Sequence, residues 1–136
     1  MDILKVIKTD NTPEIFLNHQ EKKFYISGIS RPEDVSEFYQ PVVEWMEHYQ
    51  DYLCTYEPER YSKDDPMVFK FNFEYFNSST AKFLFDILTS IKNLAECNIP
   101  VQVAWVYDME DTDMKEAGED LSILVGLEFE YIAYEL

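Results

Sequence analysis

The sequence is short of the residues on which several common functions depend. Its 136 residues include three glycines and two cysteines, and 11 lysines and arginines stand against 27 aspartates and glutamates, for a formal net charge of −16. Nucleic acids and anionic membranes are bound by clustered cations, so we expect neither as a partner. Three glycines are too few for a phosphate-cradling loop, and no apolar run approaches the roughly eighteen residues of a membrane-spanning helix.

Signals for disulfides, metal binding and secretion are equally sparse. Cys54 and Cys97 belong to no CxxC or Cys/His spacing, so the sequence supports neither a disulfide framework nor a thiolate metal site. The first residues lack the basic stretch and apolar segment of a signal peptide, and we expect a reduced, cytoplasmic protein. What the chain does have is 46% apolar and 16% aromatic residues, enough for the core of one domain over residues 1–136.

Alternating apolar and polar residues predict β-strands in several places. The clearest strand lies at 67–76, where Phe69 and Phe71 face one way and Lys70 and Asn72 face the other. Because the polar side of such strands would be exposed, helices should cover mainly one face of the sheet. Further strands are expected at 3–8, 15–18, 22–27, from 100 onwards and at 128–134.

Helical periodicity fills the gaps between these strands. An apolar stripe runs over 35–52, with Ser30 or Arg31 expected near the helix cap. Pro41 lies inside the stripe and predicts a kink, or a short helix followed by a longer one. A second helix follows the turn after the clearest strand, and a third occupies part of the acidic segment 109–125. Helices alternating with strands predict an α/β domain with a parallel or mixed sheet.

Motifs for catalysis and for metal binding are weak. In the acidic run Asp108–Asp113, the position that an EF-hand calcium loop fills with glycine is Asp113, and an acidic helix N-terminus explains the same residues. The two histidines, His19 and His48, belong to no catalytic pattern. We therefore expect no catalytic residue, no metal and no cofactor.

One turn stands out because of its position in the chain. Asn77, Ser78, Ser79 and Thr80 follow the clearest strand and open a helix, at the carboxyl end of a strand where α/β folds place their sites. Amides at a helix N-terminus favour an anion, so a phosphate on a hydroxyl would be tolerated there. An ordinary helix cap explains the same residue types.

The segment Tyr75–Lys82, with the sequence Tyr-Phe-Asn-Ser-Ser-Thr-Ala-Lys, resembles the strand–turn–helix of the SiaC family of regulatory phosphoproteins. These are bacterial domains similar to the STAS folds of anti-sigma-factor antagonists. At the helix start, Arg31-Pro32-Glu33-Asp34 stands where the family commonly has Tyr-Pro-Glu-Asn. The other segments that are similar to the family are Thr12-Pro13, Gly28–Asp34, Phe38-Tyr39, Trp105–Asp108 and Asp111–Glu119.

This resemblance implies a non-enzymatic signalling switch with a STAS-like fold, in which a single mixed sheet carries helices mainly on one face. A partner serine/threonine kinase would phosphorylate the hydroxyl after the turn asparagine, here Ser78, and a PP2C-type phosphatase would remove the phosphate. The family usually has threonine at that position, and Thr80 is the alternative acceptor. Unphosphorylated protein would bind an effector such as a diguanylate cyclase, in signalling of the kind that regulates biofilms, with Asn77, Ser79 and Thr80 at the partner contact.

Two other classes of function stay open. A phosphorylation-independent interaction module would dock a partner through the open face of the sheet or through the first helix. A small metal-binding protein would use the carboxylates of Asp108–Asp113.

Overall fold

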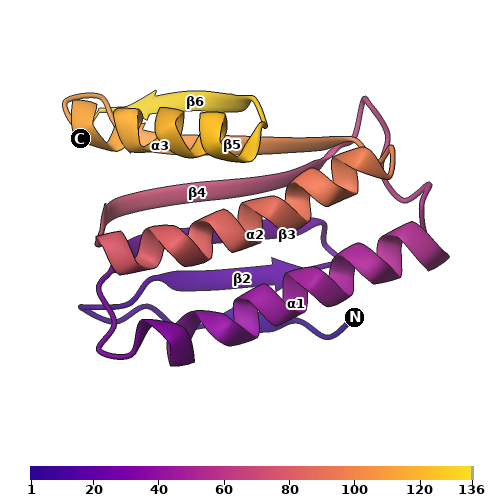
Figure 1. Ribbon diagram of the computed structural model, residues 1–136, viewed down its shortest axis with the longest axis horizontal. Coiled ribbons are helices and arrows are strands. Elements are labelled where there is room, and N and C mark those ends of the chain that lie inside the picture. Colours follow the sequence, from indigo (N-terminus) through magenta and orange to yellow (C-terminus); the bar gives the residue numbers. More distant parts are fainter. Residues whose placement is uncertain (136) are drawn as a thin grey trace.

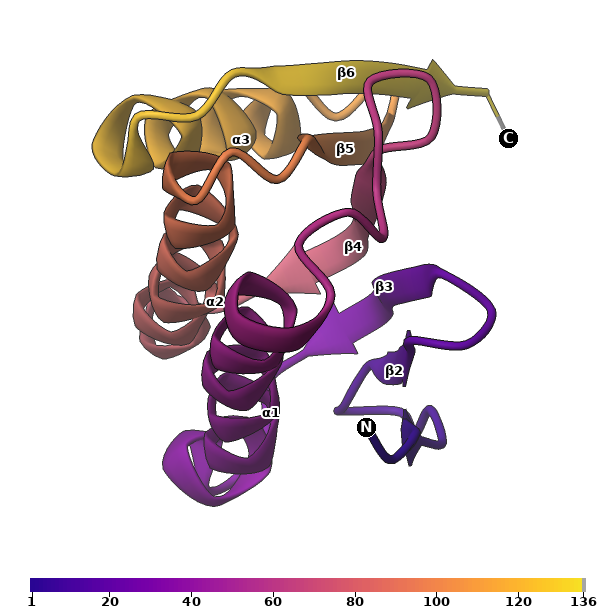
Figure 2. The same ribbon diagram turned by 90° about the vertical axis from the view of Figure 1, so that its right-hand side faces the viewer.

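The fold is a single β-sheet with helices on one of its faces (Figures 1 and 2). It is taken from a computed structural model that describes residues 1–135, so Leu136, the last residue of the expected domain, lies outside it. The predicted α/β class and the open sheet face are confirmed. The strands are β1 (Leu4–Val6), β2 (Glu14–Asn18), β3 (Lys23–Ser30), β4 (Met67–Phe76), β5 (Val101–Asp108) and β6 (Phe129–Tyr134), and the helices are α1 (Val35–Tyr56), α2 (Ser78–Glu96) and α3 (Thr112–Val125).

The strands lie in the sheet in the same order as in the sequence. β1, β2 and β3 pair antiparallel, whereas β3, β4, β5 and β6 pair parallel through the three helical crossovers. The parallel strands therefore all end on one side of the sheet, which we call the carboxyl end, and each of β3, β4 and β5 leads there into a helix. The opposite side is the amino end. Helix N-termini and the predicted turn are thus gathered at the carboxyl end.

Aromatic side chains fill the layer between sheet and helices. Phe69, Phe71 and Trp105 are buried there, while Lys70 and Glu74 of β4 are exposed on the other face of the sheet. This alternation is the cause of the one-sided arrangement, because only one face of the sheet is apolar enough to bind helices. None of the helices within residues 1–135 has both the length and the apolar character needed to cross a membrane.

Helix α1 differs from the sequence prediction at its start and in its interior. Its N-cap is Asp34, whose side chain accepts a hydrogen bond from the Glu37 amide at 3.0 Å, and not Ser30 or Arg31, because β3 continues to Ser30. The prediction of a short helix followed by a longer one is wrong, since α1 runs unbroken through Pro41. Pro41 and Glu37 are both exposed, so the carbonyl that proline leaves without a donor can be hydrated.

Candidate functional site

The predicted turn lies at the carboxyl end of the sheet, where β4 leads into α2. Asn77 is the N-cap of α2, and its side-chain oxygen accepts hydrogen bonds from the Thr80 amide at 3.0 Å and from the Thr80 hydroxyl at 2.8 Å. The Asn77 amide donates to the carbonyl oxygen of Ser30 at 3.2 Å, which ties the turn to the end of β3. The cap that the residue types suggested is therefore present, and it holds the Thr80 hydroxyl inward.

Thr80 lies fully buried beneath the turn, with an exposed fraction of 0%. Its Oγ1 is 2.9 Å from the Oγ of Ser30, which in turn is 2.6 Å from the hydroxyl of Tyr39. Burial raises the pKa of Tyr39 above its usual range, so the phenol stays neutral and the chain of hydroxyls carries no charge. The Thr80 hydroxyl is thus a member of a buried hydrogen-bond network and does not face solvent.

Ser78 and Ser79, by contrast, are exposed as the first two residues of α2. The first turn of α2 contains no acidic residue, although the whole chain is strongly acidic. Amides in the first turn of a helix have no carbonyl partners within the helix, and the aligned peptide dipoles place positive charge at this end. The surface around the Ser78 hydroxyl therefore favours an anion.

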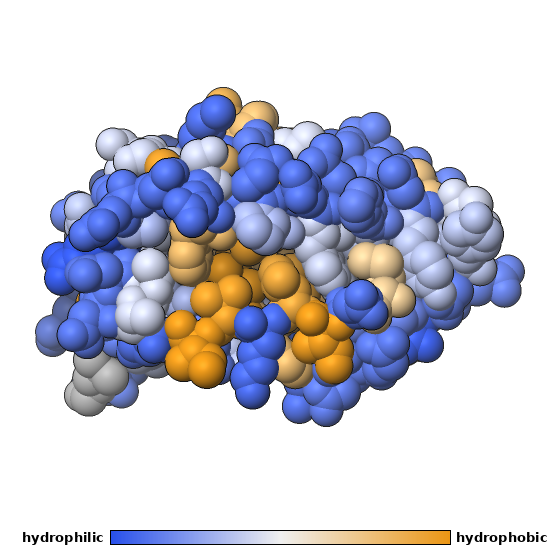
Figure 3. Space-filling view, turned by 90° about the horizontal axis from the view of Figure 1, so that it is seen from below, coloured by the Kyte–Doolittle hydropathy of each residue, from blue (hydrophilic) through white to orange (hydrophobic). Residues whose placement is uncertain are grey.

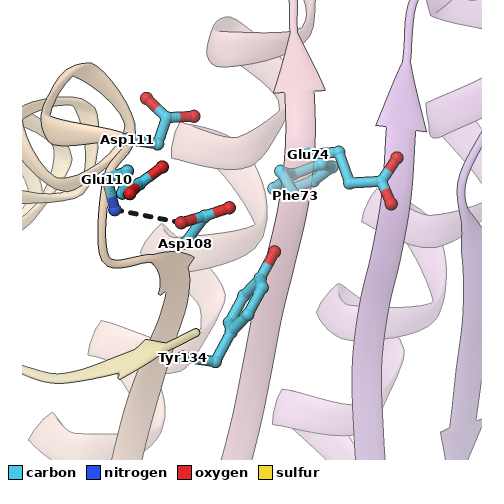
Figure 4. Close-up of a pocket in the computed structure, with 6 residues that line it drawn as sticks. All are labelled: Phe73, Glu74, Asp108, Glu110, Asp111 and Tyr134. Atoms are coloured by element: carbon cyan, nitrogen blue, oxygen red, sulfur yellow. Dashed lines mark hydrogen bonds between the residues drawn. The ribbon is translucent and has the colours of Figure 1, made fainter. Parts of the chain in front are cut away.

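An acidic hollow of about 460 Å³ lies at the same end of the sheet (Figure 4). The pairing of β4 with β5 ends at Phe71 and Trp105, and the hollow lies beyond that pair, between the ends of the two strands. Burial, and then the charge of Asp108, raise the pKa of Tyr134, one of its lining residues. The residues that line the hollow are Phe73, Glu74, Asp108, Glu110, Asp111 and Tyr134.

The carboxylates of this hollow serve the local backbone. Asp108 accepts a hydrogen bond from the Glu110 amide at 2.9 Å, and Asp111 is the N-cap of α3, accepting from the Met114 amide at 3.0 Å. The side chain of Glu74 points away from Asp108 (Figure 4). Within residues 1–135 no group of three or more histidine, cysteine, aspartate or glutamate side chains is placed to hold a metal ion. The hollow is therefore a negative surface that attracts cations of a partner.

No sequence pattern predicts the cluster around His19. At the amino end of the sheet, His19 is buried, with Nδ1 2.8 Å from the Tyr49 hydroxyl and Nε2 3.0 Å from Glu57, and its carbonyl accepts from Arg60 at 2.9 Å. Burial, and then the charge of Arg60, lower the pKa of His19, so the ring is neutral near pH 7. His48, the other histidine, is exposed on α1. His19 is thus structural, and its partners lie too far along the chain for any spacing to reveal them.

The fold also brings the two cysteines together. Asn93 of α2 donates a hydrogen bond to the side chain of Gln50 of α1 at 3.3 Å. Cys54 lies one helical turn after Gln50 and Cys97 lies one turn after Asn93, so the two cysteines lie at the same end of the contact between these helices. Burial, and then the neighbouring Cys97 thiol, raise the pKa of Cys54 to about 11. Both thiols are free.

Comparison with known proteins gives consistent matches. The family model described as SiaC family regulatory phosphoprotein matches residues 6–134. An uncharacterized protein of Pseudomonas aeruginosa strain UCBPP-PA14 is 26% identical over 122 residues, which cover 88% of this chain and 87% of that protein.

Solved structures share the fold over nearly the whole chain. The crystal structure of apo-SiaC from Pseudomonas aeruginosa has a TM-score of 0.80 and 24% identity, covering 98% of this chain and 100% of that one. A chain in the crystal structure of the diguanylate cyclase SiaD in complex with its activator SiaC, from the same organism, has a TM-score of 0.81 and 24% identity, covering 96% of this chain and 99% of that one.

Proposed function

Because the chain belongs to the SiaC family of regulatory phosphoproteins, we propose that it is a signalling switch controlled by phosphorylation of Ser78. Membership of this family makes the chain a regulatory protein and not an enzyme. The observation that carries the proposal is the division of the turn into an exposed Ser78 and a buried Thr80. A kinase approaches its acceptor hydroxyl from solvent, so of these two residues it can reach Ser78 and not Thr80.

The contacts of the turn favour Ser78 over the other hydroxyls. Presenting Thr80 to a kinase would break its hydrogen bonds to Asn77 and Ser30 and open the start of α2. Ser79 is exposed, but the family resemblance places the acceptor directly after the asparagine. Ser78 meets both conditions.

The phosphorylated turn would keep its structure. A phosphate adds about −1.5 to −2 charges at pH 7, and a negative charge at a helix N-terminus is stabilised by about 0.3–1 kcal/mol. The cap bond from Asn77 to the Thr80 amide does not involve Ser78 and stays in place. Phosphorylation would therefore change the surface at one point and leave the fold unchanged.

Phosphorylation of Ser78 would be suited to releasing a bound partner. In the unmodified turn, the first amides of α2 are available to an acceptor group of a partner, such as a carboxylate or a carbonyl. A phosphate on Ser78 would occupy those amides and repel that acceptor, and it would have to be desolvated in any contact that covers it. The unphosphorylated form would be the binding form.

The proposed partners follow from the family. A serine/threonine kinase would add the phosphate and a PP2C-type phosphatase would remove it. The SiaC of Pseudomonas aeruginosa is named as the activator of the diguanylate cyclase SiaD, and we assign a diguanylate cyclase to this chain as its effector. Asn77, Ser79 and Thr80 lie around Ser78; the exposed Ser79 would contact the partner, and Asn77 and Thr80 would hold the shape of the turn.

The test is the intact mass of the protein after incubation with its proposed partner serine/threonine kinase. Wild-type chain and the Ser79→Ala and Thr80→Ser variants should each gain one phosphate, whereas Ser78→Ala should gain none. Full incorporation into Ser78→Ala would show that the acceptor is a different residue. Cyclic di-GMP production by the proposed effector cyclase should rise when unphosphorylated chain is added and fall back once Ser78 carries phosphate.

A second function, docking without phosphorylation, is favoured by the exposed apolar side chains that flank β1, Ile3 and Ile7. Effector binding with no mass shift under any kinase treatment would select this function over the first.

A further inference from the structure

A groove of about 410 Å³ runs between α1 and β1, on the flank of the molecule formed by the first strand. Its apolar floor includes Leu4, Val6 and Phe38, and its rim carries the carboxylates of Glu33, Asp34 and Glu37. Figure 3 shows this flank, with apolar side chains gathered in its middle and hydrophilic ones around them. We call it the α1–β1 groove.

The topology explains why this part of the sheet is poorly covered. Each helix belongs to a crossover between parallel strands, from β3 to β4, from β4 to β5 and from β5 to β6. β1 and β2 reach β3 through antiparallel turns and bring no helix with them. The helical layer consequently ends at α1, while the sheet continues to β1 (Figures 1 and 2).

The outer strand is short and carries one lysine, yet it leaves apolar side chains exposed. Edge strands are commonly shielded by charged residues or by proline, which prevent association with other chains. The only charged residue within β1 is Lys5, which pairs with Phe16, while Leu4 and Val6 are only half-buried. Ile3 and Ile7 flank the strand and are 54% and 78% exposed. Exposed apolar side chains beside a groove of this kind mark a candidate interaction site.

The charges around the groove define what fits it. Every charged residue that lines it is a carboxylate, and in the described part of the chain no lysine or arginine contributes to the lining. We propose that the α1–β1 groove binds an amphipathic helix of a partner protein, with an apolar stripe on the floor and flanking lysine or arginine side chains against Glu33, Asp34 and Glu37. Such a helix would pack beside α1 at about 8–10 Å and extend the helical layer.

Other occupants fit the groove less well. β1 is three residues long, which offers a partner strand very few backbone hydrogen bonds. A second copy of this chain would bring another molecule of net charge −16 against an acidic rim. A basic helix satisfies both the apolar floor and the rim.

The proposal goes beyond the switch at Ser78 and does not depend on it. None of the residues that line the groove belongs to the turn Asn77–Thr80, so binding in the groove should not require a phosphate on Ser78. A failure of phosphorylation at Ser78 therefore leaves this proposal intact, and the reverse is also true.

The probe for the test is a fluorescein-labelled 18-residue peptide of leucine and lysine, with leucines at helical spacing. A peptide of the same composition, scrambled so that the leucines no longer form a stripe, measures non-specific attraction to an acidic protein. A leucine–glutamate peptide with the stripe intact measures the need for positive charge. Fluorescence anisotropy at 0.15 M salt should give a Kd for the striped basic peptide about tenfold lower than for either control.

Two charge-reversal variants place the binding site. Glu33→Lys with Glu37→Lys alters the exposed rim and should abolish the preference for the striped peptide, whereas Glu47→Lys with Asp51→Lys alters exposed residues of α1 outside the groove and should retain it. Both pairs change the net charge equally. Equal loss in both variants, or no preference between striped and scrambled peptide, would overturn the proposal.

The floor of the groove is tested by Val6→Thr, which keeps the size and branching of the side chain but replaces one methyl group with a hydroxyl. It should weaken the striped peptide about threefold or more, while Val68→Thr, on a strand outside the groove, should leave its Kd unchanged. Sedimentation velocity of the chain alone should show a monomer. If the wild-type chain forms a dimer and Val6→Thr dissociates it, the groove binds a second copy of this chain and the proposed partner helix is refuted.

Discussion

Replacing Gly118 with alanine should destabilise the protein, although alanine is the better helix former. Gly118 lies in the middle of α3, where the helix packs directly on the indole of Trp105. A Cβ atom at this position would lie 2.5 Å from Nε1, 2.6 Å from Cδ1 and 2.7 Å from Cε2 of that indole. Contacts this short cannot exist, so either the helix or the indole must move.

The surroundings of Trp105 make that movement costly. The side chain is 1% exposed and stacks on Phe129 with ring centres 5.9 Å apart, and its indole N–H donates to the Met114 carbonyl of α3 at 2.9 Å. Overpacking a core costs about 1–3 kcal/mol, and losing the indole hydrogen bond costs about 1 kcal/mol more. Alanine returns about 1 kcal/mol of helix propensity. The net expectation is a loss of about 1–3 kcal/mol in the free energy of unfolding.

Urea unfolding followed by far-UV circular dichroism measures this loss, and thermal unfolding should show a Tm lower by roughly 3–10 °C. Asp120→Ala, at an exposed position of α3, is the control and should stay within about 0.5 kcal/mol of wild type. Adding Trp105→Phe to Gly118→Ala should recover part of the alanine cost in a double-mutant cycle. A Gly118→Ala variant as stable as wild type would refute the reasoning.

Three further predictions concern residues that the fold buries. Thr80→Val removes the hydroxyl from its two buried partners and should lower the free energy of unfolding in urea by about 1–3 kcal/mol, and an unchanged value would contradict the network. At pH 8, iodoacetamide should modify Cys97, which is exposed, well before Cys54, whose pKa is raised to about 11, as peptide mass spectrometry would show; equal rates would be inconsistent with this burial. The lowered pKa of His19 means that the unfolded chain binds more protons than the folded one as the pH falls through about 6.5, so stability should decline on acidification through this range. His19→Gln should flatten this decline, and a decline that stays unchanged in His19→Gln would disprove the assignment.

The strands and the one-sided helix cover of the sheet could be predicted because they depend on local patterns. The alternation in β4 predicted both a strand and the exposed face of the sheet, and the segments similar to the SiaC family predicted the family. The N-terminus of α1 was misplaced because Ser30 and Asp34 are both good caps, and the choice between them depends on how far β3 is held by its pairing with β4. Helix α1 passes through Pro41 because packing outweighs one lost hydrogen bond.

The rest of the site depends on contacts between distant segments. Ser78 and Thr80 are similar hydroxyl residues in one turn, and only the position of Ser30, at the end of another strand, shows which of them is buried. Predicting the α1–β1 groove would require knowing that β1 is the outermost strand, and no residue pattern within β1 indicates that position. The juxtaposition of Cys54 and Cys97 likewise follows from the packing of α1 on α2.

The order of the strands has a consequence for how the protein is made. Each strand is added beside the one before it, so a chain leaving the ribosome can build the sheet in the order of translation. The hydrogen-bond network around Thr80 is formed by residues that lie between positions 30 and 80, so it is complete once α2 has emerged. The acidic hollow needs Asp108 and Tyr134 and arises only after β6 has emerged. The turn Asn77–Thr80 is thus formed in the nascent chain before the acidic surface beside it, and the two are present together only once β6 has joined the sheet.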